Sequence, residues 1–446
     1  MGAAPSKSTD EGEDVPSATG TDYQLISELA ALPLYCLAFQ INKMRFDAIL
    51  SSDSPSRAPH WPAQRMCIAP RQRLSLVSRG QMHVTLVRRL TFSSCEIAVK
   101  RARWLANRIA AQRHRVGLKN EPAECCATLK AHDDWVASVA FHPSGRYIAT
   151  GSHDKTVKLW RLNQRCAAAE CVSTLHIGKK RAFALARGSS VAFHPSAPYL
   201  AIADADGTSL WRINKECSGA KLQLRLATTP AECVFHVAFH PSAPCLVTAS
   251  SHGSSIWRIN TDCTAVQRAS KELEDDEGGR ASYSAAFHPS EPYLATGSHG
   301  ICRLWQLNRD GTVGERVLKL RGHDVFHPVH SVAFHPSALV VASGSGDGSA
   351  KLWQFNADCS DSKCLMTLEG RGGPVYSVAF HPSAVLLATG SGNGSAKLWL
   401  LNLGSGAATL VAQLQGHGGP VRAVALHPSA LCLATGSDFG GVKLWQ

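Results

Sequence analysis

From about residue 124 onward, short runs of apolar, β-branched and aromatic residues alternate with tight turns. The first such unit holds a run at Val136–Phe141, a His-Pro-Ser turn, a second run at Tyr147–Thr150, and a third run that ends at Trp160. Runs of this length bounded by Gly, Pro, Asp and Ser are typical of β-strands joined by hairpin turns. The pattern therefore predicts antiparallel strands.

The same unit recurs with a nearly constant period. Its His-Pro-Ser turn and its closing tryptophan each appear seven times, and successive histidines are 46 to 52 residues apart. The histidines are His142, His194, His240, His288, His335, His381 and His427, and the tryptophans are Trp160, Trp211, Trp257, Trp305, Trp353, Trp399 and Trp445. A period in this range is the signature of a repeat architecture.

A fourth apolar run lies between successive units, for example at Val172–Leu175 and Leu365–Leu368. Seven units of four antiparallel strands are too many for one open sheet. Radial stacking of small sheets covers both faces of each and protects their edges. The predicted fold class is therefore all-β, with the sheets arranged as a propeller.

Residues of about 124–446 resemble a WD40 β-propeller. The resemblance rests on seven copies in register, on a Gly-His or Ala-His pair before some first strands (His132, His323, His417), and on the Leu-Trp or Ile-Trp that ends the third. The Asp that usually follows this Trp in the family is missing throughout. The resemblance implies a seven-bladed ring closed by an N-terminal strand. Cys126–Lys130 is the candidate for this strand, because its sequence is similar to the fourth apolar run of the other units.

Two units carry Ser or Thr, His and Asp together, which are the residue types of a catalytic triad. The WD40 resemblance implies a structural role instead: a buried indole N–H needs an acceptor, a hydroxyl supplies it, and His and Asp complete the series. Arg371 and Asn393 replace the His and Asp in the sixth unit, and Phe439 occupies the Asp position in the seventh. The second to fourth units lack the Gly-His pair and are expected to be the softer part of the ring. The two complete tetrads are His132, Thr150, Asp154, Trp160 and His323, Ser343, Asp347, Trp353.

Neither a metal nor a cofactor is expected. Zinc would need imidazoles within about 4 Å of one another, whereas packed sheets lie about 10 Å apart, so the His-Pro-Ser histidines are expected to finish their turns. The strings at 344–351 and 390–397 are rich in Gly but lack the strand–loop–helix context of a phosphate-binding loop. The chain is therefore expected not to be an enzyme.

The first 123 residues form a separate extension. Residues 1–22 are predicted to be disordered, and Gly2 begins an N-myristoylation pattern that neighbouring acids disfavour. Residues 23–39 are apolar, but Glu28 and Pro33 interrupt them, which argues against a signal peptide or a spanning helix. The expected location is intracellular, in the cytoplasm or nucleus.

Residues 65–119 hold thirteen Lys and Arg against one acid, Glu96. The net charge of this segment therefore equals the whole chain's formal net charge of +12. The propeller is therefore balanced and is not expected to offer a generic nucleic-acid surface. The plain interpretation of the basic segment is a solvated, partly helical linker. The alternative is an electrostatic contact with nucleic acid or anionic membrane.

Leu32-Pro33 and the segment 74–79 resemble the two ends of an F-box, the helical module that docks on the adaptor of cullin-RING ubiquitin ligases. An F-box followed by WD40 repeats is a domain order of substrate receptors. In this chain the interval across residues 32–79 is longer than usual, three prolines interrupt it, and no Trp follows Arg79.

The fifteen cysteines include no CxxC pair with zinc spacing, and free thiols in a reducing compartment are expected. Two pairs, Cys166/Cys171 and Cys359/Cys364, flank predicted loops between third and fourth strands, where each pair could approach.

These observations predict a noncatalytic protein–protein interaction scaffold, a monomeric propeller within a larger complex. The alternatives are a cullin-RING substrate receptor that uses residues 32–79 and a nucleic-acid or membrane tether that uses residues 65–119. By family analogy, partners dock on the face that bears the Gly-His pairs. Aromatic and Arg side chains dominate interface energetics, and the candidates there are Trp135, His153, Phe326, Arg371, Tyr376 and Phe439.

Overall fold

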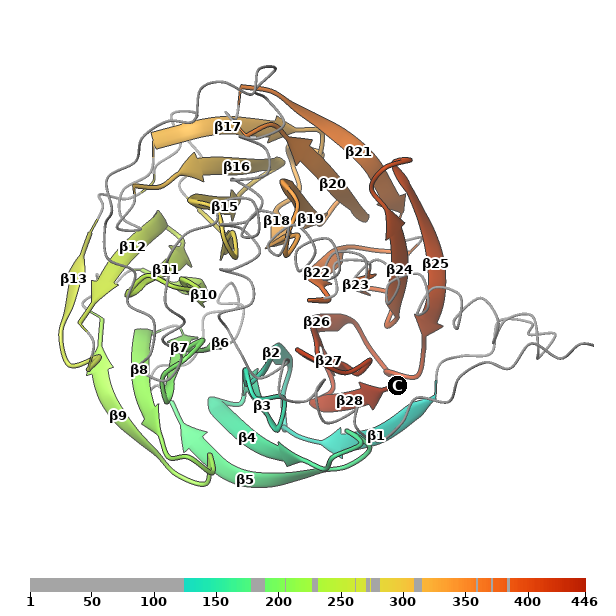
Figure 1. Cartoon of the computed structure of the whole chain (residues 1–446). Coiled ribbons are helices and arrows are strands. Elements are labelled where there is room, and N and C mark those ends of the chain that lie inside the picture. The colour runs from blue at the N-terminus through green and yellow to red at the C-terminus, as the bar shows by residue number, and fades with distance from the viewer. Residues whose placement is uncertain are drawn as a thin grey trace, which may run out of the picture. The chain divides into compact units, whose positions relative to one another are not determined.

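The computed structural model describes residues 124–177, 189–204, 206–226, 232–260, 262–269, 273, 281–308, 315–357, 360–369, 372–382 and 386–446. In this part of the chain, seven four-stranded antiparallel sheets stand around a common centre (Figure 1). The ring confirms the prediction of an all-β, seven-bladed propeller. The predictions for residues 1–123, including the segments 32–79 and 65–119, lie outside the described residues.

Each blade runs from an inner strand outward, and blades 1 to 7 are numbered in chain order. The inner strands are β2 (Val136–Phe141), β6 (Ser190–Phe193), β10 (Val234–Phe239), β14 (Ser284–Phe287), β18 (Val329–Phe334), β22 (Val375–Phe380) and β26 (Val421–Leu426). The second strands are β3 (Tyr147–Ser152), β7 (Tyr199–Asp204), β11 (Cys245–Ser250), β15 (Tyr293–Gly297), β19 (Val340–Ser345), β23 (Leu386–Ser391) and β27 (Leu433–Ser437).

The third strand of each blade ends at or just beyond its tryptophan, and the fourth lies at the rim (Figure 1). The third strands are β4 (Thr156–Leu162), β8 (Gly207–Ile213), β12 (Gly253–Ile259), β16 (Ile301–Gln306), β20 (Ser349–Phe355), β24 (Ala396–Asn402) and β28 (Gly441–Trp445). The outer strands are β5 (Ala169–His176), β9 (Ala220–Arg225), β13 (Val266–Arg268), β17 (Glu315–Arg321), β21 (Ser362–Glu369), β25 (Ala407–Leu414) and β1 (Cys125–Lys130).

The ring is closed by the N-terminal strand, as predicted. The strand β1 pairs antiparallel with β28, with Leu129 opposite Val442 and Thr128 opposite Lys443, so the seventh blade has the order β1-β28-β27-β26. The strand begins one residue before the predicted Cys126. Because this strand comes from the beginning of the propeller and its three partners come from the end, pairing joins blade 7 to blade 1.

Neighbouring blades pack closely because small residues on the second strands leave room for valine side chains on the first strands of the next blade. A Cβ added to Gly436 of β27 would lie 2.6 Å from the Val136 side chain of β2, and one added to Gly390 would lie 3.0 Å from Val421. Blades 2 and 3 carry Ala203 and Ala249 at this position. A larger residue there would push adjacent blades apart, since packed interiors have little free volume.

Serine hydroxyls also join inner strands. In five blades a first-strand Ser accepts a hydrogen bond from a backbone N–H of the next blade's inner strand, at 3.1 to 3.3 Å. These serines are Ser138, Ser190, Ser284, Ser331 and Ser377. In blade 3 the position is occupied by His236, whose Nδ1 is shielded from solvent and has no hydrogen-bond partner.

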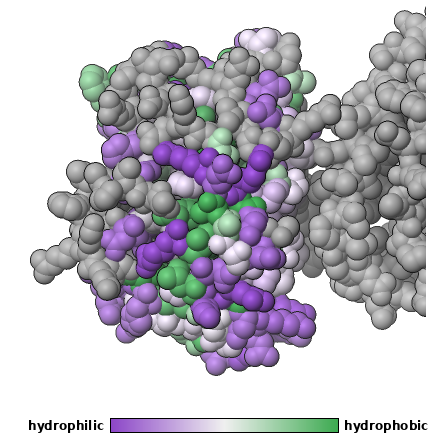
Figure 2. Space-filling model, turned by 90° about the vertical axis from the view of Figure 1, so that its left-hand side faces the viewer, coloured by the Kyte–Doolittle hydropathy of each residue, from purple (hydrophilic) through white to green (hydrophobic). Residues whose placement is uncertain are grey.

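The outer strands are half exposed, in contrast to the second strands. Seen edge-on from the side of β13, apolar side chains gather in the middle of the outer wall, with hydrophilic residues around them (Figure 2). Leu222 of β9 and Leu410 of β25 are among the exposed large apolar residues of the rim strands. The rim is therefore only partly polar.

Candidate functional site

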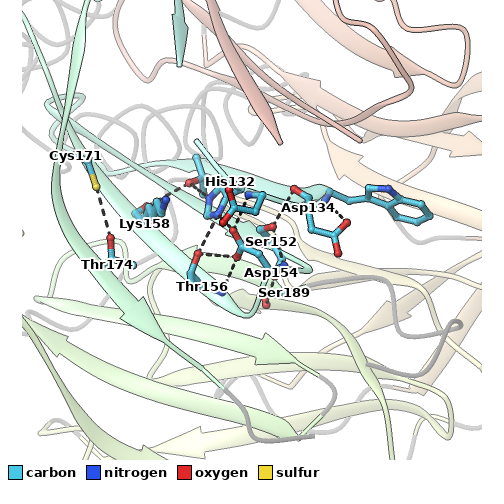
Figure 3. A network of polar contacts seen from close by, with 12 residues as sticks. His132, Asp134, Ser152, Asp154, Thr156, Lys158, Cys171, Thr174 and Ser189 are labelled. Atoms are coloured by element: carbon cyan, nitrogen blue, oxygen red, sulfur yellow. Dashed lines mark hydrogen bonds and ion pairs between the residues drawn. The ribbon is translucent and has the colours of Figure 1, made fainter. Parts of the chain in front are cut away.

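The tetrad residues of blade 1 are joined by hydrogen bonds. Figure 3 shows the part of this network around His132, Asp154 and Thr156. The Trp160 indole N–H donates to Thr150 Oγ1 at 3.0 Å, and Thr150 Oγ1 lies 2.8 Å from His132 Nε2. His132 Nδ1 lies 2.8 Å from Asp154 Oδ2, and Asp154 Oδ1 accepts from the Thr156 N–H and hydroxyl at 2.8 and 2.7 Å. Although burial opposes ionisation, hydrogen bonds from His132 and Thr156 hold the pKa of Asp154 below its usual value.

Blade 5 repeats this geometry. The Trp353 N–H donates to Ser343 Oγ at 2.9 Å, Ser343 Oγ lies 2.7 Å from His323 Nε2, and His323 Nδ1 lies 2.8 Å from Asp347 Oδ2. Again burial opposes ionisation, but hydrogen bonds from His323 and Ser349 lower the pKa of Asp347. The same four residue types thus make the same contacts in two blades.

The hydroxyls of both tetrads face inward. Thr150 and Ser343 are each 0% exposed, so neither hydroxyl can reach a substrate. In every blade the indole of the closing tryptophan donates to a hydroxyl, at 2.8 to 3.1 Å. The acceptors are Thr150, Ser209, Thr248, Thr296, Ser343, Thr389 and Thr435. This geometry supports a structural role rather than nucleophilic catalysis, because a nucleophile must touch its substrate.

A different set of side chains surrounds the mouth of the central channel. We call it the collar: Phe235, Tyr283, His330, Tyr376 and Arg422, together with Trp135. Ring centroids are 5.5 Å apart for Phe235 and Tyr283, 6.4 Å for Tyr283 and His330, and 5.1 Å for His330 and Tyr376. Contacts of this kind are favourable beyond the area that they bury. The collar therefore joins six blades through contacts between rings and one guanidinium.

Arg422 closes the collar between the last blade and the first. Its guanidinium carbon lies 4.0 Å from the Tyr376 ring centre and 4.7 Å from the Trp135 ring centre. Arg422 Nε and Nη2 also donate to the two carboxylate oxygens of Asp438, at 2.6 and 2.9 Å. Burial opposes the charge, but Asp438 and Tyr376 raise the pKa of Arg422. A planar, two-point contact of this type suits Arg and not Lys.

A cavity of about 240 Å³ opens at the collar. Its deeper wall includes the inner-strand residues Ser138, His236 and Ser331, while His153 lies at the mouth beside Trp135, with ring centroids 5.1 Å apart. Burial lowers the pKa of His153, although neighbouring Asp134 opposes this shift. The mouth is thus an aromatic surface with one cation, Arg422, held by Asp438.

The other sequence-predicted interface residues lie on the same face. Phe326, in the loop between β17 and β18, is 86% exposed, and Phe439, in the turn between β27 and β28, is 73% exposed. The Phe439 ring lies so close to Gly419 that a Cβ there would be 2.6 Å from it. Trp135 is 42% exposed. Arg371 lies outside the described residues.

Four collar residues escaped the sequence prediction: Phe235, Tyr283, His330 and Arg422. A signal was available, because each lies five residues before the histidine of its own His-Pro-Ser turn, as Tyr376 does. In propeller geometry, equivalent positions of successive blades meet at the centre. Residues about 46 apart in sequence therefore become neighbours.

The His-Pro-Ser histidines occupy the opposite face. In six of them Nδ1 accepts backbone N–H bonds within the same turn, for example from Ser429 and Ala430 at 3.1 and 2.9 Å in His427. Several rings also pack edge-on against the phenylalanine of the next blade, as His142 does against Phe193 with centroids 5.0 Å apart. Burial lowers the pKa of His142, His194, His240, His288 and His381. These rings are therefore neutral turn and packing elements near pH 7.

Across the described ranges, no three His, Cys, Asp or Glu side chains gather as ligands of one metal ion would. Nor does this part of the chain contain a helix with the length and apolar character needed to cross a membrane.

Seven four-stranded blades closed by an N-terminal strand define a β-propeller. The model of the WD40 family (WD domain, G-beta repeat) matches five stretches, residues 123–161, 277–306, 314–354, 362–399 and 408–446. Five stretches within the propeller are therefore WD40 repeats.

Several relatives are fungal nuclear distribution proteins. The chain is 36% identical over 95 residues to nuclear distribution protein PAC1-2 of Uncinocarpus reesii, which is 21% of this chain and 20% of that protein. It is 45% identical over 51 residues to nuclear distribution protein nudF 2 of Aspergillus clavatus, or 11% of each chain. It is 36% identical over 63 residues to nudF 2 of Penicillium rubens, or 14% of each. The chain thus spans a fifth or less of these relatives.

Proposed function

We propose that this protein is a noncatalytic scaffold that binds protein partners through the face that carries the collar. The observation that carries the proposal is the collar itself, in which Arg422 is held between Trp135 and Tyr376 at the mouth of the central cavity. Trp, Tyr and Arg are the residues that most often dominate binding energy at protein interfaces.

The collar is rigid before any partner arrives. Its members sit at the start of inner strands, and Asp438 fixes the Arg422 guanidinium at two points. Little side-chain entropy is therefore lost on binding, which favours affinity. Around this rigid centre, Phe326 and Phe439 project from loops and add exposed apolar area.

The WD40 repeats and the collar support proteins as the class of partner. The names of the relatives suggest the cellular process in which such partners act. Because the matched relatives are named nuclear distribution proteins, nuclear positioning is the first process in which to look for partners. We also infer an intracellular location, since the eleven cysteines of the described residues are free thiols, as is usual in a reducing compartment.

Affinity purification of the full-length chain tests the proposal. The bait variant is Trp135→Ala, and the matched control is Leu222→Ser, which changes an exposed apolar residue of β9 on the rim. Proteins recovered with wild type and with the control should be lost or reduced about tenfold or more with Trp135→Ala, as expected for an interface hot spot. Equal recovery by all three baits would contradict the proposal, provided that both variants unfold at the wild-type temperature.

The two alternative functions rest on residues outside the described part of the chain. Replacing residues 74–79 by alanine in the full-length bait tests the substrate-receptor hypothesis, because the cullin-ligase adaptor should then be lost while collar-dependent partners remain. A steep fall in nucleic-acid or vesicle binding with salt would instead favour the tether that uses residues 65–119.

A further inference from the structure

At the face opposite the collar, a repeated contact joins several neighbouring blades. The residue that begins a second strand lies against the hairpin turn between the third and outer strands of the following blade. Tyr199 of blade 2 donates its hydroxyl to the Asp262 carbonyl in blade 3 at 2.8 Å, and Tyr293 of blade 4 donates to the Ala357 carbonyl in blade 5 at 2.8 Å.

At the junction between blade 7 and blade 1, both positions are cysteines. Cys432 stands five residues after His427, as Tyr199 stands five after His194. Cys166 occupies the turn position that Cys263 holds in blade 3, with the same left-handed backbone, φ 51° against 49°. The repeat geometry alone therefore brings the two thiols together.

The contact is buried and close. Cys166 and Cys432 are 4% and 1% exposed and belong to one hydrophobic cluster with Trp160 and Leu162. The two thiols interact with each other electrostatically, and His427 interacts with Cys166. Both cysteines are free thiols in this structure.

The neighbourhood favours a thiolate at one of the two sulfurs. Hydrogen bonds from Cys432 and His427 lower the pKa of Cys166, and the hydrogen bond to Cys166 and burial raise the pKa of Cys432. Burial opposes protonation of His427, but its contacts with Cys166 and the Gly145 carbonyl raise its pKa, unlike that of the other His-Pro-Ser rings cited above. A low-pKa thiol beside a second thiol shares two features with redox-sensing cysteines, whereas those cysteines are usually more exposed than this pair.

We propose that Cys166 and Cys432 are a redox-modification site: a hydroperoxide oxidises them to a disulfide that clamps blade 7 to blade 1. The Cys166 thiol gives up its proton, its thiolate attacks the terminal peroxide oxygen, and the O–O bond breaks. A sulfenic acid forms, and the leaving hydroxide or alkoxide takes up the released proton to become water or alcohol. The Cys432 thiol then attacks the Cys166 sulfur, the S–O bond breaks, and water leaves with the thiol proton. Two thiols lose two electrons, and the peroxide gains them.

The clamp would act at the one junction where the ring closes. There β1 joins blade 7 while the rest of the N-terminal repeat forms blade 1. A bond between Cys166 and Cys432 would tie together residues that enclose blades 2 to 6, and constraints on long loops stabilise most. Arg422 and Trp135 meet across the same junction.

Peptide mapping of the full-length protein tests the proposal. Reduced protein is treated with hydrogen peroxide, remaining thiols are alkylated, and trypsin with a Glu-specific protease cuts after Glu170, which separates Cys166 from Cys171. The expected product is a Cys166–Cys432 linked peptide that disappears on reduction. Oxidation should also raise the melting temperature of the propeller by about 3 °C or more, and the shift should be absent in Cys432→Ser.

The matched control is Cys217→Ser, which changes the same turn position in blade 2, where no cysteine faces it. This variant should keep both the linked peptide and the temperature shift. Linkage of Cys432 to Cys126 instead, or oxidation confined to the exposed Cys171 and Cys364, would overturn the proposal. The wild-type peptide map needs no variant. It therefore shows whether Cys166 and Cys432 form a disulfide even if Cys432→Ser fails to fold.

Discussion

Replacing His236 with serine should make the propeller more resistant to acid. In five other blades, the equivalent position is a serine that bonds to the next inner strand. His236 leaves its Nδ1 without a partner, and burial lowers its pKa from 6.5 to about 4. A serine would offer its hydroxyl to the Ala285 N–H of blade 4 and would remove the titrating group.

The size of the effect follows from proton linkage. Below pH 6.5 the unfolded chain protonates His236, whereas the native protein resists protonation until the pH approaches 4. Stability is therefore present above pH 6.5 and is lost as the pH falls toward 4. With these two pKa values, His236 lowers the free energy of unfolding by about 2 kcal/mol when the pH falls from 7 to 5. Because the His236 ring keeps partial contact with the central cavity, we expect about 1 to 2 kcal/mol.

Urea unfolding of the full-length protein at pH 7 and pH 5, followed by tryptophan fluorescence, measures this difference. Wild type should lose about 1 to 2 kcal/mol more than His236→Ser over this interval. Other buried histidines, such as His288 and His417, contribute to both proteins and cancel. The control is His176→Ser at the exposed end of β5, which should lose as much as wild type. Equal losses in His236→Ser and wild type would refute the reasoning.

Three further changes test other parts of the structure. Gly440→Ala should lower stability by about 2 to 4 kcal/mol in urea unfolding, because Gly440 has φ +70° and a Cβ there would lie 1.9 Å from the His132 carbonyl oxygen; a loss below 1 kcal/mol would contradict this. Asp154→Ala should cost about 1 to 3 kcal/mol at pH 7 by leaving polar partners unpaired. Since the pKa of Asp154 is lowered from 3.8, that difference should shrink as the pH falls below 3.8, and a constant difference would count against it. Arg422→Lys should weaken partner binding about tenfold in a titration, because Lys cannot bond Asp438 at two points and its charge is then no longer held between Trp135 and Tyr376; unchanged affinity would exclude Arg422 from the interface.

The fold could be predicted because each blade repeats the same pattern of apolar runs and turn residues. The run Val136–Phe141 is a strand with those bounds, and the expected run Val172–Leu175 lies within the longer β5. The closing strand was recognisable because Cys126–Lys130 resembles the other outer strands. Local pattern and ring closure agree, as they do in sequences that specify one structure.

The collar was harder to predict because its members share a position and not a residue type. Phe235, His330 and Arg422 have no common motif, and only the ring brings them together. The cysteines show the same limit. The sequence suggested that Cys166 could approach Cys171 along one hairpin, but Cys171 lies opposite Trp160 in the strand register and is exposed. The left-handed turn at Cys166 buries that thiol against Cys432 of the neighbouring blade.

Site-specific photo-crosslinking tests the central claim, protein binding through the collar face, most directly. A benzophenone amino acid is placed at Phe439 on the collar face or at Leu431 on the opposite face, two exposed apolar positions at 73% and 46%. Each full-length protein is then irradiated with its purified partners. We predict that the probe at Phe439 captures partners and the probe at Leu431 does not. Capture from Leu431 alone would contradict the account and move the interface to the His-Pro-Ser face.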